Sequence, residues 1–335
     1  MADRVIKAAL LGLGTVGGGV YKVLKMQEEE MIPKLGAKVE LKKILVRNIE
    51  KASKKIDDPS LLTNNWKEIV EDPEIEIVIE LIGGMEPART YILEALEAGK
   101  NVLCEKSFTV NADQARALFK LAEEKNLLIT EAIWTRYMPS RKIIQDIVES
   151  GVIGEVTSLT ANLSYAVTEK ERIRKPELAG GALLDVGVYP INFASMVLGE
   201  NLKDVQSSAI FEGGVDILET IIMNFEGNKM ATLQSGVREI SDRMGSIFGT
   251  KGYIQVQNIN NPEKITVFNQ KHEETASYFP PKQITGYEYE VRACKKALEE
   301  GKIECLEMPH AKTVRIMEIM DGLRKSGGYE IPEVE

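Results

Sequence analysis

The chain has 335 residues, of which 44% are hydrophobic and 28% charged, and 42 Lys and Arg against 51 Asp and Glu give a formal net charge of −9. This length exceeds one ordinary core and predicts two domains of about 150 residues each. The acidic balance argues against broad nucleic-acid binding, because nothing neutralises phosphates wholesale.

The cysteines and histidines are too few and too scattered for several kinds of site. The three cysteines do not form a CxxC spacing, and the two histidines, His272 and His310, lack the neighbours of a metal cluster or a Ser-His-Asp triad. The pattern fits a reducing cytosol. No apolar run reaches the ~20 residues that span a bilayer, and the N-terminus does not resemble a signal peptide. We therefore predict a cytoplasmic protein without a metal or a membrane segment.

Short apolar runs alternate with helical patterns over roughly the first 135 residues. The run at 75–82 is mostly β-branched, as in a strand that is covered on both faces. Alternating strands and helices predict a parallel, doubly wound sheet. The predicted strands are 5–11, 39–46, 75–82, 101–104 and 127–131, and the predicted helices are 15–31, 86–98 and 111–125.

After Gly151 the pattern changes to successive strands that are separated by short glycine-containing turns, which predicts a mostly antiparallel, open sheet. We predict a nucleotide-binding α/β domain over 1–135 and an α+β domain over 136–335. The C-terminal helices are expected to pack against one of the two domains. The predicted strands are 155–168, 204–212, 216–226, 229–238, 244–249 and 252–257, and the predicted helices lie near 190–198 and at 286–300 and 309–325.

A glycine motif, Gly12-x-Gly14-x-x-Gly17, directly follows the first strand and opens a helix at Thr15 and Val16. The motif alone is weak, but this strand–turn–helix context is what dinucleotide binding of the Rossmann type requires. The first glycine permits the turn, the second lets the pyrophosphate approach, and the helix N-terminus supplies free N–H groups. The alternative is a glycine-rich turn without a ligand.

The second strand ends at Val46-Arg47-Asn48, where an acid that binds the ribose 2′-hydroxyl of NAD is expected. Arg47 occupies that place, and a guanidinium suits a phosphate dianion. We predict a preference for NADP(H), with NAD(H) possible. The alternative is a surface arginine on a loop.

Three segments carry a resemblance to a known family: Glu-Lys-Ser at 105–107, EAIWTRYMP at 131–139 and GGALLDVGVYP at 180–190. Together they resemble the Gfo/Idh/MocA oxidoreductases over about 101–335, and within them the trans-1,2-dihydrobenzene-1,2-diol dehydrogenases. Residues 10–100, including Gly83 and Gly84, are instead similar to the nucleotide-binding domain of homoserine dehydrogenases. We predict a mosaic of two lineages, natural or engineered, that joins near 100–105; the alternative is ordinary divergence within one family.

The resemblance implies a catalytic set. Lys106 follows the fourth predicted strand and is given a role in substrate binding and proton transfer. Asp185 and Tyr189 are four apart, which places both on one face of a helix. A tyrosine of ordinary pKa near 10 is a poor base at neutral pH, but a neighbouring cation such as Lys106 would lower that pKa. We predict that Lys106 and Tyr189 share the acid/base role while Asp185 orients the substrate hydroxyl or the lysine; the alternatives are a solvated loop lysine and a buried helix tyrosine.

The resemblance also implies further contacts. Gly83, Gly84, Glu105 and Lys106 are assigned to the cofactor, Glu105 to the nicotinamide ribose. Trp134, Arg136 and Tyr137 are placed near the nicotinamide and the substrate, and for Trp134 the alternative is packing at the domain junction. Ser107 replaces the proline that usually follows the lysine in this family, which puts the rigidity of that turn in doubt.

The predicted function is NAD(P)H-dependent hydride transfer to or from a secondary alcohol or ketone of a sugar, inositol or cyclic diol. The alternatives are a homoserine-dehydrogenase-like activity and a cofactor-binding chimera or regulatory protein with little turnover. Helices are expected on one face of an antiparallel sheet of about six strands. The open face predicts a homodimer, or a homotetramer.

Overall fold

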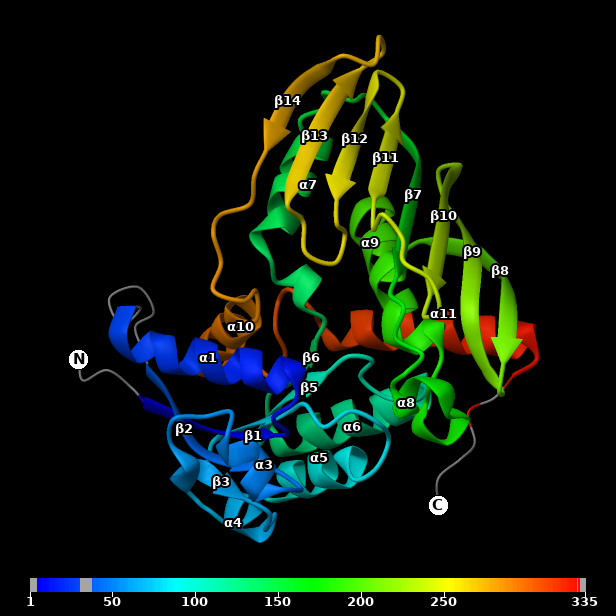
Figure 1. Cartoon of the computed structure of the whole chain (residues 1–335). Coiled ribbons are helices and arrows are strands. Elements are labelled where there is room, and N and C mark those ends of the chain that lie inside the picture. Colours follow the sequence, from blue (N-terminus) through cyan, green and yellow to red (C-terminus); the bar gives the residue numbers. More distant parts are fainter. Residues whose placement is uncertain (1–4, 31–37, 330, 332–335) are drawn as a thin grey trace. The chain divides into compact units, whose positions relative to one another are not determined.

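The computed structural model describes residues 5–30, 38–329 and 331 (Figure 1). The chain divides into two compact units. Residue 31, the end of the first predicted helix, lies outside the described residues. Unit 1 comprises Met1–Thr109, Asp113–Trp134 and Gln283–Thr313, and unit 2 comprises Val110–Ala112, Thr135–Lys282 and Val314–Glu335.

Unit 1 contains a six-stranded, all-parallel sheet with the order β3-β2-β1-β4-β5-β6, which is the doubly wound order of dinucleotide-binding domains. The predicted α/β class is confirmed. The sequence pattern missed β3, because its two residues are too few to show a periodicity. The strands are β1 (Val5–Leu11), β2 (Lys38–Leu45), β3 (Leu62–Thr63), β4 (Ile77–Glu80), β5 (Asn101–Glu105) and β6 (Ile129–Ala132).

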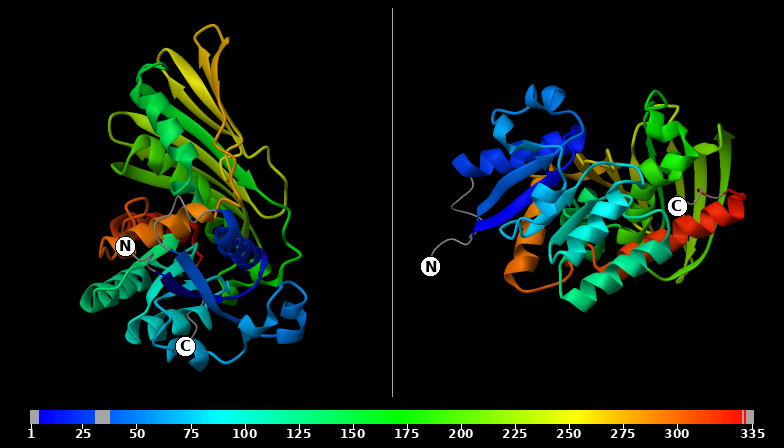
Figure 2. Two further views of the ribbon diagram at one scale, coloured as in Figure 1. Left: turned by 90° about the vertical axis from the view of Figure 1, so that its left-hand side faces the viewer. Right: turned by 90° about the horizontal axis from the view of Figure 1, so that it is seen from below.

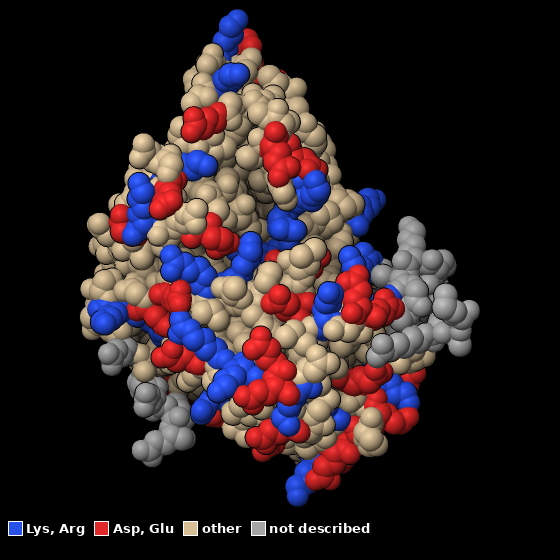
Figure 3. All heavy atoms as spheres, turned by 180° about the vertical axis from the view of Figure 1, so that it is seen from behind, with Lys and Arg blue, Asp and Glu red and all other residues tan. Residues whose placement is uncertain are grey.

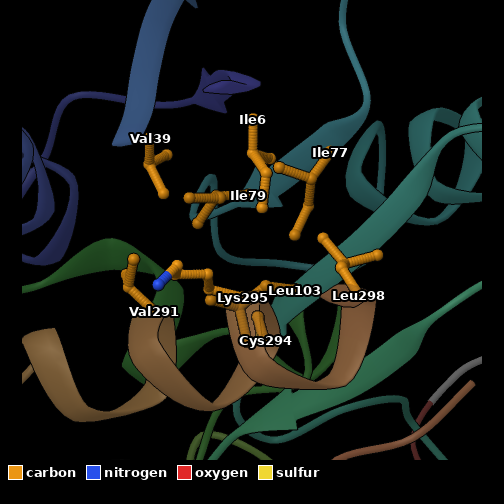
Figure 4. Close-up of a pocket in the computed structure, with 9 residues that line it drawn as sticks. All are labelled: Ile6, Val39, Ile77, Ile79, Leu103, Val291, Cys294, Lys295 and Leu298. Carbon is orange, nitrogen blue, oxygen red and sulfur yellow. The ribbon is translucent and has the colours of Figure 1, made fainter. Parts of the chain in front are cut away.

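Helices cover both faces of this sheet. Figures 1 and 2 show α1 and α10 on one face and α5 and α6 on the other. Figure 4 shows the apolar contact between α10 and the sheet, with Val291, Cys294 and Leu298 facing Ile6 and Ile77. A segment near the C-terminus therefore completes the first unit. The helices are α1 (Thr15–Glu30), α3 (Ile49–Ser53), α4 (Lys67–Val70), α5 (Ala88–Glu97), α6 (Ala112–Lys125) and α10 (Glu288–Glu299).

Unit 2 contains an eight-stranded sheet with the order β14-β13-β12-β11-β7-β10-β9-β8. Its pairings are antiparallel except between β7 and β10, so the predicted mostly antiparallel sheet is confirmed. The expected count of six strands is wrong, because β13 and the largely exposed edge strand β14 lack a clear hydrophobic alternation. The strands are β7 (Val156–Ser164), β8 (Leu202–Glu212), β9 (Val215–Phe225), β10 (Lys229–Gly236), β11 (Gly245–Gly249), β12 (Gly252–Gln257), β13 (Lys264–Asn269) and β14 (Glu274–Tyr278).

The helices of unit 2 include α7 (Pro139–Glu149), α8 (Glu171–Arg174), a π-helix (Leu183–Gly187) that continues into α9 (Val188–Leu198), and most of α11 (His310–Gly327). Figures 1 and 2 show α7 and α9 on the same side of the sheet. The stretch Pro176–Leu198 is long and apolar enough to cross a membrane by length and composition, but 78% of its most apolar window is buried inside the protein. We interpret it as a core helix, and two acids, Glu177 and Asp185, interrupt it.

Candidate functional site

The glycine turn between β1 and α1 has the geometry of a pyrophosphate site. Gly12 has φ +103°, and a Cβ on Gly17 would lie 2.4 Å from the Gly12 carbonyl oxygen, so both positions require glycine. A Cβ on Gly14 would have no described atom within 4 Å, which leaves open space in front of the exposed Thr15. The first N–H groups of α1 begin there. The residues present therefore fit a dinucleotide.

A second glycine turn, at Gly83 and Gly84 after β4, is organised by a carboxyl group that the sequence reasoning missed. Glu80 is 3% exposed, and its Oε1 accepts a hydrogen bond from the Ile82 N–H at 2.6 Å. Burial raises the pKa of Glu80 to about 7, against the opposing hydrogen bonds of the Ile82 and Gly83 amides and Cys104. The acidic residue within the apolar run IVIELI was the available signal.

Two cations lie near the carboxyl ends of β1 and β2. The Gly12 N–H, just after β1, donates a hydrogen bond to the carbonyl oxygen of Leu45, the last residue of β2, at 2.9 Å. Arg47 is exposed after β2, and the Asn48 side chain caps α3. Lys55, which the sequence reasoning did not select, places its Nζ 3.2 Å from the carbonyl oxygen of Leu13 in the glycine turn. Sequence spacing could not identify this contact, since 42 residues separate the two.

Glu105 ends β5, and Glu105, Lys106 and Ser107 are all half-buried. The Lys106–Ser107 peptide bond is cis. These residues follow a parallel strand at the carboxyl edge of the sheet, where open α/β sheets bind ligands. The position is suitable for a group that acts on a bound substrate.

An aromatic pair adjoins this edge within unit 1. The half-buried Trp134 stacks on Tyr287 with ring centroids 5.0 Å apart, and a Cβ on Gly19 would lie 2.6 Å from the Tyr287 ring. Burial, with the nearby Glu105 and Glu290 carboxylates, raises the pKa of Tyr287 to about 12, so its hydroxyl stays protonated. Tyr287 comes from the segment that returns late in the chain, and the sequence reasoning missed it.

In unit 2, Asp185 lies in the π-helix and Tyr189 in the first turn of α9. Within residues 181–190, all of which the structure describes, these two are half-buried and the other eight are buried. Asp185 Oδ1 pairs with Arg172 Nη2 at 2.7 Å. Within this stretch, Asp185 and Tyr189 are therefore the two side chains that can meet a ligand.

The other two predicted substrate residues have a different setting. Arg136 is 1% exposed and Tyr137 is 7% exposed. The guanidinium of Arg136 donates from Nε to Asn192 Oδ1 at 2.5 Å and from Nη2 to Ser195 Oγ at 3.0 Å, both on α9. These contacts give Arg136 a part in holding α9, and a direct contact with substrate stays a prediction.

The remaining candidate groups are structural. The His310 ring stacks on Phe119 with centroids 4.0 Å apart, and its Nε2 lies 2.9 Å from the Ile129 carbonyl oxygen. Cys294 and Cys305 are buried with their Sγ atoms 3.9 Å apart. Among the residues that the structure describes, no group of three or more His, Cys, Asp or Glu is arranged to hold a metal ion.

The doubly wound unit with its glycine turn defines a dinucleotide-binding protein that carries a second, mostly antiparallel sheet unit. Comparison with known families assigns both parts. A model described as "GFO/IDH/MocA C-terminal domain" matches residues 142–255, and one described as "Homoserine dehydrogenase, NAD binding domain" matches residues 12–131, beyond the predicted junction at 100–105. With the relatives below, these matches show that the chain belongs to the Gfo/Idh/MocA family.

Two curated relatives and one solved structure illustrate the similarity. The chain is 33% identical to a D-xylose 1-dehydrogenase (NADP(+)) of Hypocrea jecorina, over 81% of this chain and 77% of the relative. It is 31% identical to a trans-1,2-dihydrobenzene-1,2-diol dehydrogenase of Xenopus laevis, over 86% of this chain and 90% of the relative. A 3-ketoreductase of Actinomadura kijaniata has the same fold, with a TM-score of 0.84 and 22% identity over 96% of this chain and 98% of that one.

Proposed function

We propose that this chain is an oxidoreductase that transfers hydride between a nicotinamide cofactor and a secondary alcohol or ketone of a sugar, inositol or cyclic diol. The observation that carries the proposal is the open glycine turn at the carboxyl edge of the parallel sheet, in a chain whose family relatives are named dehydrogenases of a diol and a sugar. The bound nicotinamide would supply or accept the hydride, and the residues of this chain handle the proton.

The preferred cofactor is NADP(H), and NAD(H) is the alternative. Arg47 at the end of β2 replaces the carboxylate that would repel a 2′-phosphate. Lys55 adds a second cation at the neighbouring glycine turn. The NADP(+)-dependent relative supports the same preference.

Lys106, Tyr189 and Asp185 form the proposed catalytic set. Oxidation of an alcohol requires a base that removes the hydroxyl proton, and reduction returns that proton to the oxygen. In the proposal Lys106 and Tyr189 share this transfer, and Asp185 orients the substrate hydroxyl or the lysine. The burial pattern supports Asp185 and Tyr189, which are the two half-buried residues of the stretch 181–190, and the carboxyl edge of the sheet supports Lys106. Trp134 is proposed as an apolar wall for the nicotinamide or the sugar ring.

The test is Tyr189→Phe, which removes one hydroxyl and keeps the ring. We expect kcat to fall about a hundredfold with a polyol or diol substrate, because general acid–base groups contribute about 10²–10⁴, while the NADPH affinity in a fluorescence titration stays unchanged. Tyr165→Phe, a hydroxyl loss in unit 2 at a residue that contacts Asn260, serves as the matched control. Normal turnover of Tyr189→Phe would contradict the assignment.

One observation supports a second candidate function. The NAD-binding model that matches residues 12–131 is that of homoserine dehydrogenases. A homoserine-dehydrogenase-like enzyme would oxidise homoserine, whereas a chimera or cofactor-binding regulator would bind NADPH with little turnover of any substrate. NADPH and NADH titrations followed by a panel of sugars, inositols, diols and homoserine separate these alternatives. The mosaic origin of the chain stays a prediction.

We propose that the protein forms a homodimer, or a dimer of dimers, through the open face of the unit 2 sheet. One row across that face joins Met230, Ser158, Phe248, Tyr253 and Phe268, which pair in register on adjacent strands. Met230 and Phe248 are 45% and 36% exposed, and Tyr253 stacks on Phe268 with centroids 4.7 Å apart. A largely apolar row of this kind is typical of an interface.

Light scattering tests this assembly. A particle of 37.2 kDa at micromolar concentration would contradict the homodimer, and Phe248→Glu is expected to convert the dimer into that monomer.

Figure 3 shows basic and acidic side chains interspersed on one face of the protein, without a single basic surface for nucleic acid. We also propose a cytoplasmic location, since all three cysteines are buried and free.

A further inference from the structure

A buried carboxylate lies against the start of the π-helix that carries Asp185. Asp216, the second residue of β9, is 1% exposed. Its Oδ2 accepts a hydrogen bond from the Leu183 N–H at 2.7 Å, and the Ala182 N–H also donates to the carboxylate. The first N–H groups of a helix have no partner within the helix, and negative charge is favourable there. Asp216 therefore caps this helix from a strand that lies 33 residues further along the chain.

The backbone before the helix is shaped to admit this carboxylate. Gly181 has φ +109°, and a Cβ there would lie 2.0 Å from Asp216 Oδ1. A Cβ on Gly180 would lie 2.5 Å from the Ile173 carbonyl oxygen. Two consecutive glycines are thus required by two different close approaches, which fixes the chain immediately before Ala182.

The other half of the same helix is held by a second buried charge. Arg136 donates to Asn192 and Ser195 on α9, as described above, and Ser195 Oγ in turn donates to Glu200 Oε1 at 3.0 Å. Asp185 and Tyr189 lie between the contact of Asp216 and those of Arg136. Their placement therefore depends on groups that do not themselves reach the surface.

A charged carboxylate in this buried position costs free energy of folding. Burial, with a smaller contribution from the Glu219 carboxylate, raises the pKa of Asp216 to about 7. Glu219, three residues along β9, is also 1% exposed. An asparagine or an apolar residue would avoid the cost of the Asp216 charge. Local violations of this kind in native proteins concentrate at functional sites, and so do π-helical turns.

We propose that Asp216 is a positioning residue for the reaction: its carboxylate fixes the start of the π-helix and thereby the placement of Asp185 and Tyr189 against the substrate. The inference rests on the proposed function, in which those two side chains act on the substrate hydroxyl. It assigns no contact between Asp216 and the substrate. A displacement of about 1 Å in a catalytic group can cost about a hundredfold in rate, so loss of the cap should appear in kcat.

The experiment compares Asp216→Asn with Glu219→Gln, which also neutralises a buried carboxyl of β9 but leaves the cap of the π-helix in place. NADPH titration first counts the intact cofactor sites in each preparation, and kcat and KM are then expressed per intact site. We expect Asp216→Asn to lower kcat per site by about tenfold to a hundredfold, with NADPH affinity within twofold of wild type. Glu219→Gln should keep its kcat per site within about twofold. A purely structural role would lower the melting temperature and leave kcat per site unchanged in the protein that stays folded.

Gly181→Ala provides a second variant, because its methyl group displaces the carboxylate while every ionisable group remains. It should reproduce the loss of kcat per site. Wild-type kcat per site in both Asp216→Asn and Gly181→Ala would overturn the positioning role. Absence of turnover in the wild-type protein, with NADPH still bound, would instead overturn the proposed function, and this inference with it.

Discussion

The proposed site of unit 1 consists mainly of backbone groups, whereas that of unit 2 consists of side chains. In unit 1 the cofactor site consists mainly of backbone: glycines 12, 14 and 17 shape a turn, and the first N–H groups of α1 face its open side. In unit 2 the site consists of two side chains, Asp185 and Tyr189, which are half-buried in a stretch, 181–190, whose other residues are buried. The first depends on local geometry within six residues. The second depends on distant residues, so it should be the more sensitive to changes that touch no ligand.

The largest expected effect tests the chemistry at the edge of unit 1. Lys106→Met removes the proposed proton-handling cation and should lower kcat by about a thousandfold, within the range of general acid–base catalysis. NADPH affinity should change little, because the glycine turn is intact. Steady-state kinetics and a fluorescence titration measure the two quantities. Lys120→Met, a change at an exposed lysine on α6, is the control, and an equal loss of activity in both variants would contradict the role of Lys106.

The next effect separates the backbone site from the side-chain site. Gly17→Ala places a methyl group 2.4 Å from the Gly12 carbonyl oxygen, which forces the turn open. We expect NADPH and NADH to lose affinity alike, by about tenfold or more, since about 1.4 kcal/mol corresponds to tenfold. Gly18→Ala, where no described atom lies within 4 Å of the added Cβ, is the matched control. Unchanged binding by Gly17→Ala would place the dinucleotide elsewhere.

A smaller effect tests the cations that distinguish the two cofactors. Arg47→Gln and Lys55→Gln should each weaken NADPH binding by about tenfold, which corresponds to the low end of the about 1.5–3 kcal/mol that a hydrogen bond to a charged group contributes, and leave NADH binding nearly unchanged. Isothermal titration of both cofactors gives the ratio. Lys54→Gln, next to Lys55 and exposed, is the control. A parallel loss for NADPH and NADH would exclude a 2′-phosphate contact.

The last effect concerns stability. Because burial raises the pKa of Glu80 from 4.5 to about 7, the folded state binds the proton more tightly than the unfolded state. The contribution of Glu80 to the free energy of unfolding is therefore largest at low pH. It falls as the pH rises from about 4.5 to 7, by up to about 3 kcal/mol at about 1.4 kcal/mol per pH unit. Glu80→Gln lacks this titration, so the melting temperature of the variant should rise relative to that of the wild type between pH 5 and pH 8. A difference that is independent of pH would contradict the raised pKa.

Much of unit 1 could be predicted from the sequence because its signals are short-range. The spacing of Gly12, Gly14 and Gly17 after an apolar run is enough to indicate the turn, and the doubly wound order follows from the alternation of strands and helices. The spacing of Asp185 and Tyr189 likewise placed both on one helix face. Edge strands β3 and β14 escaped detection because one is two residues long and the other is largely exposed.

The sequence by itself determined the dinucleotide turn, the change from parallel to antiparallel architecture, and the positions of Asp185 and Tyr189 in the first half of the apolar helix near 183–198. Each depends on residues within a few turns of one another. Only the tertiary structure decided that Lys55 reaches the Leu13 carbonyl, that Tyr287 stacks on Trp134, and that Asp216 caps the π-helix. These contacts join residues 33 to about 150 positions apart, and no local periodicity specifies which distant side chain the folded chain will bring to a given backbone group.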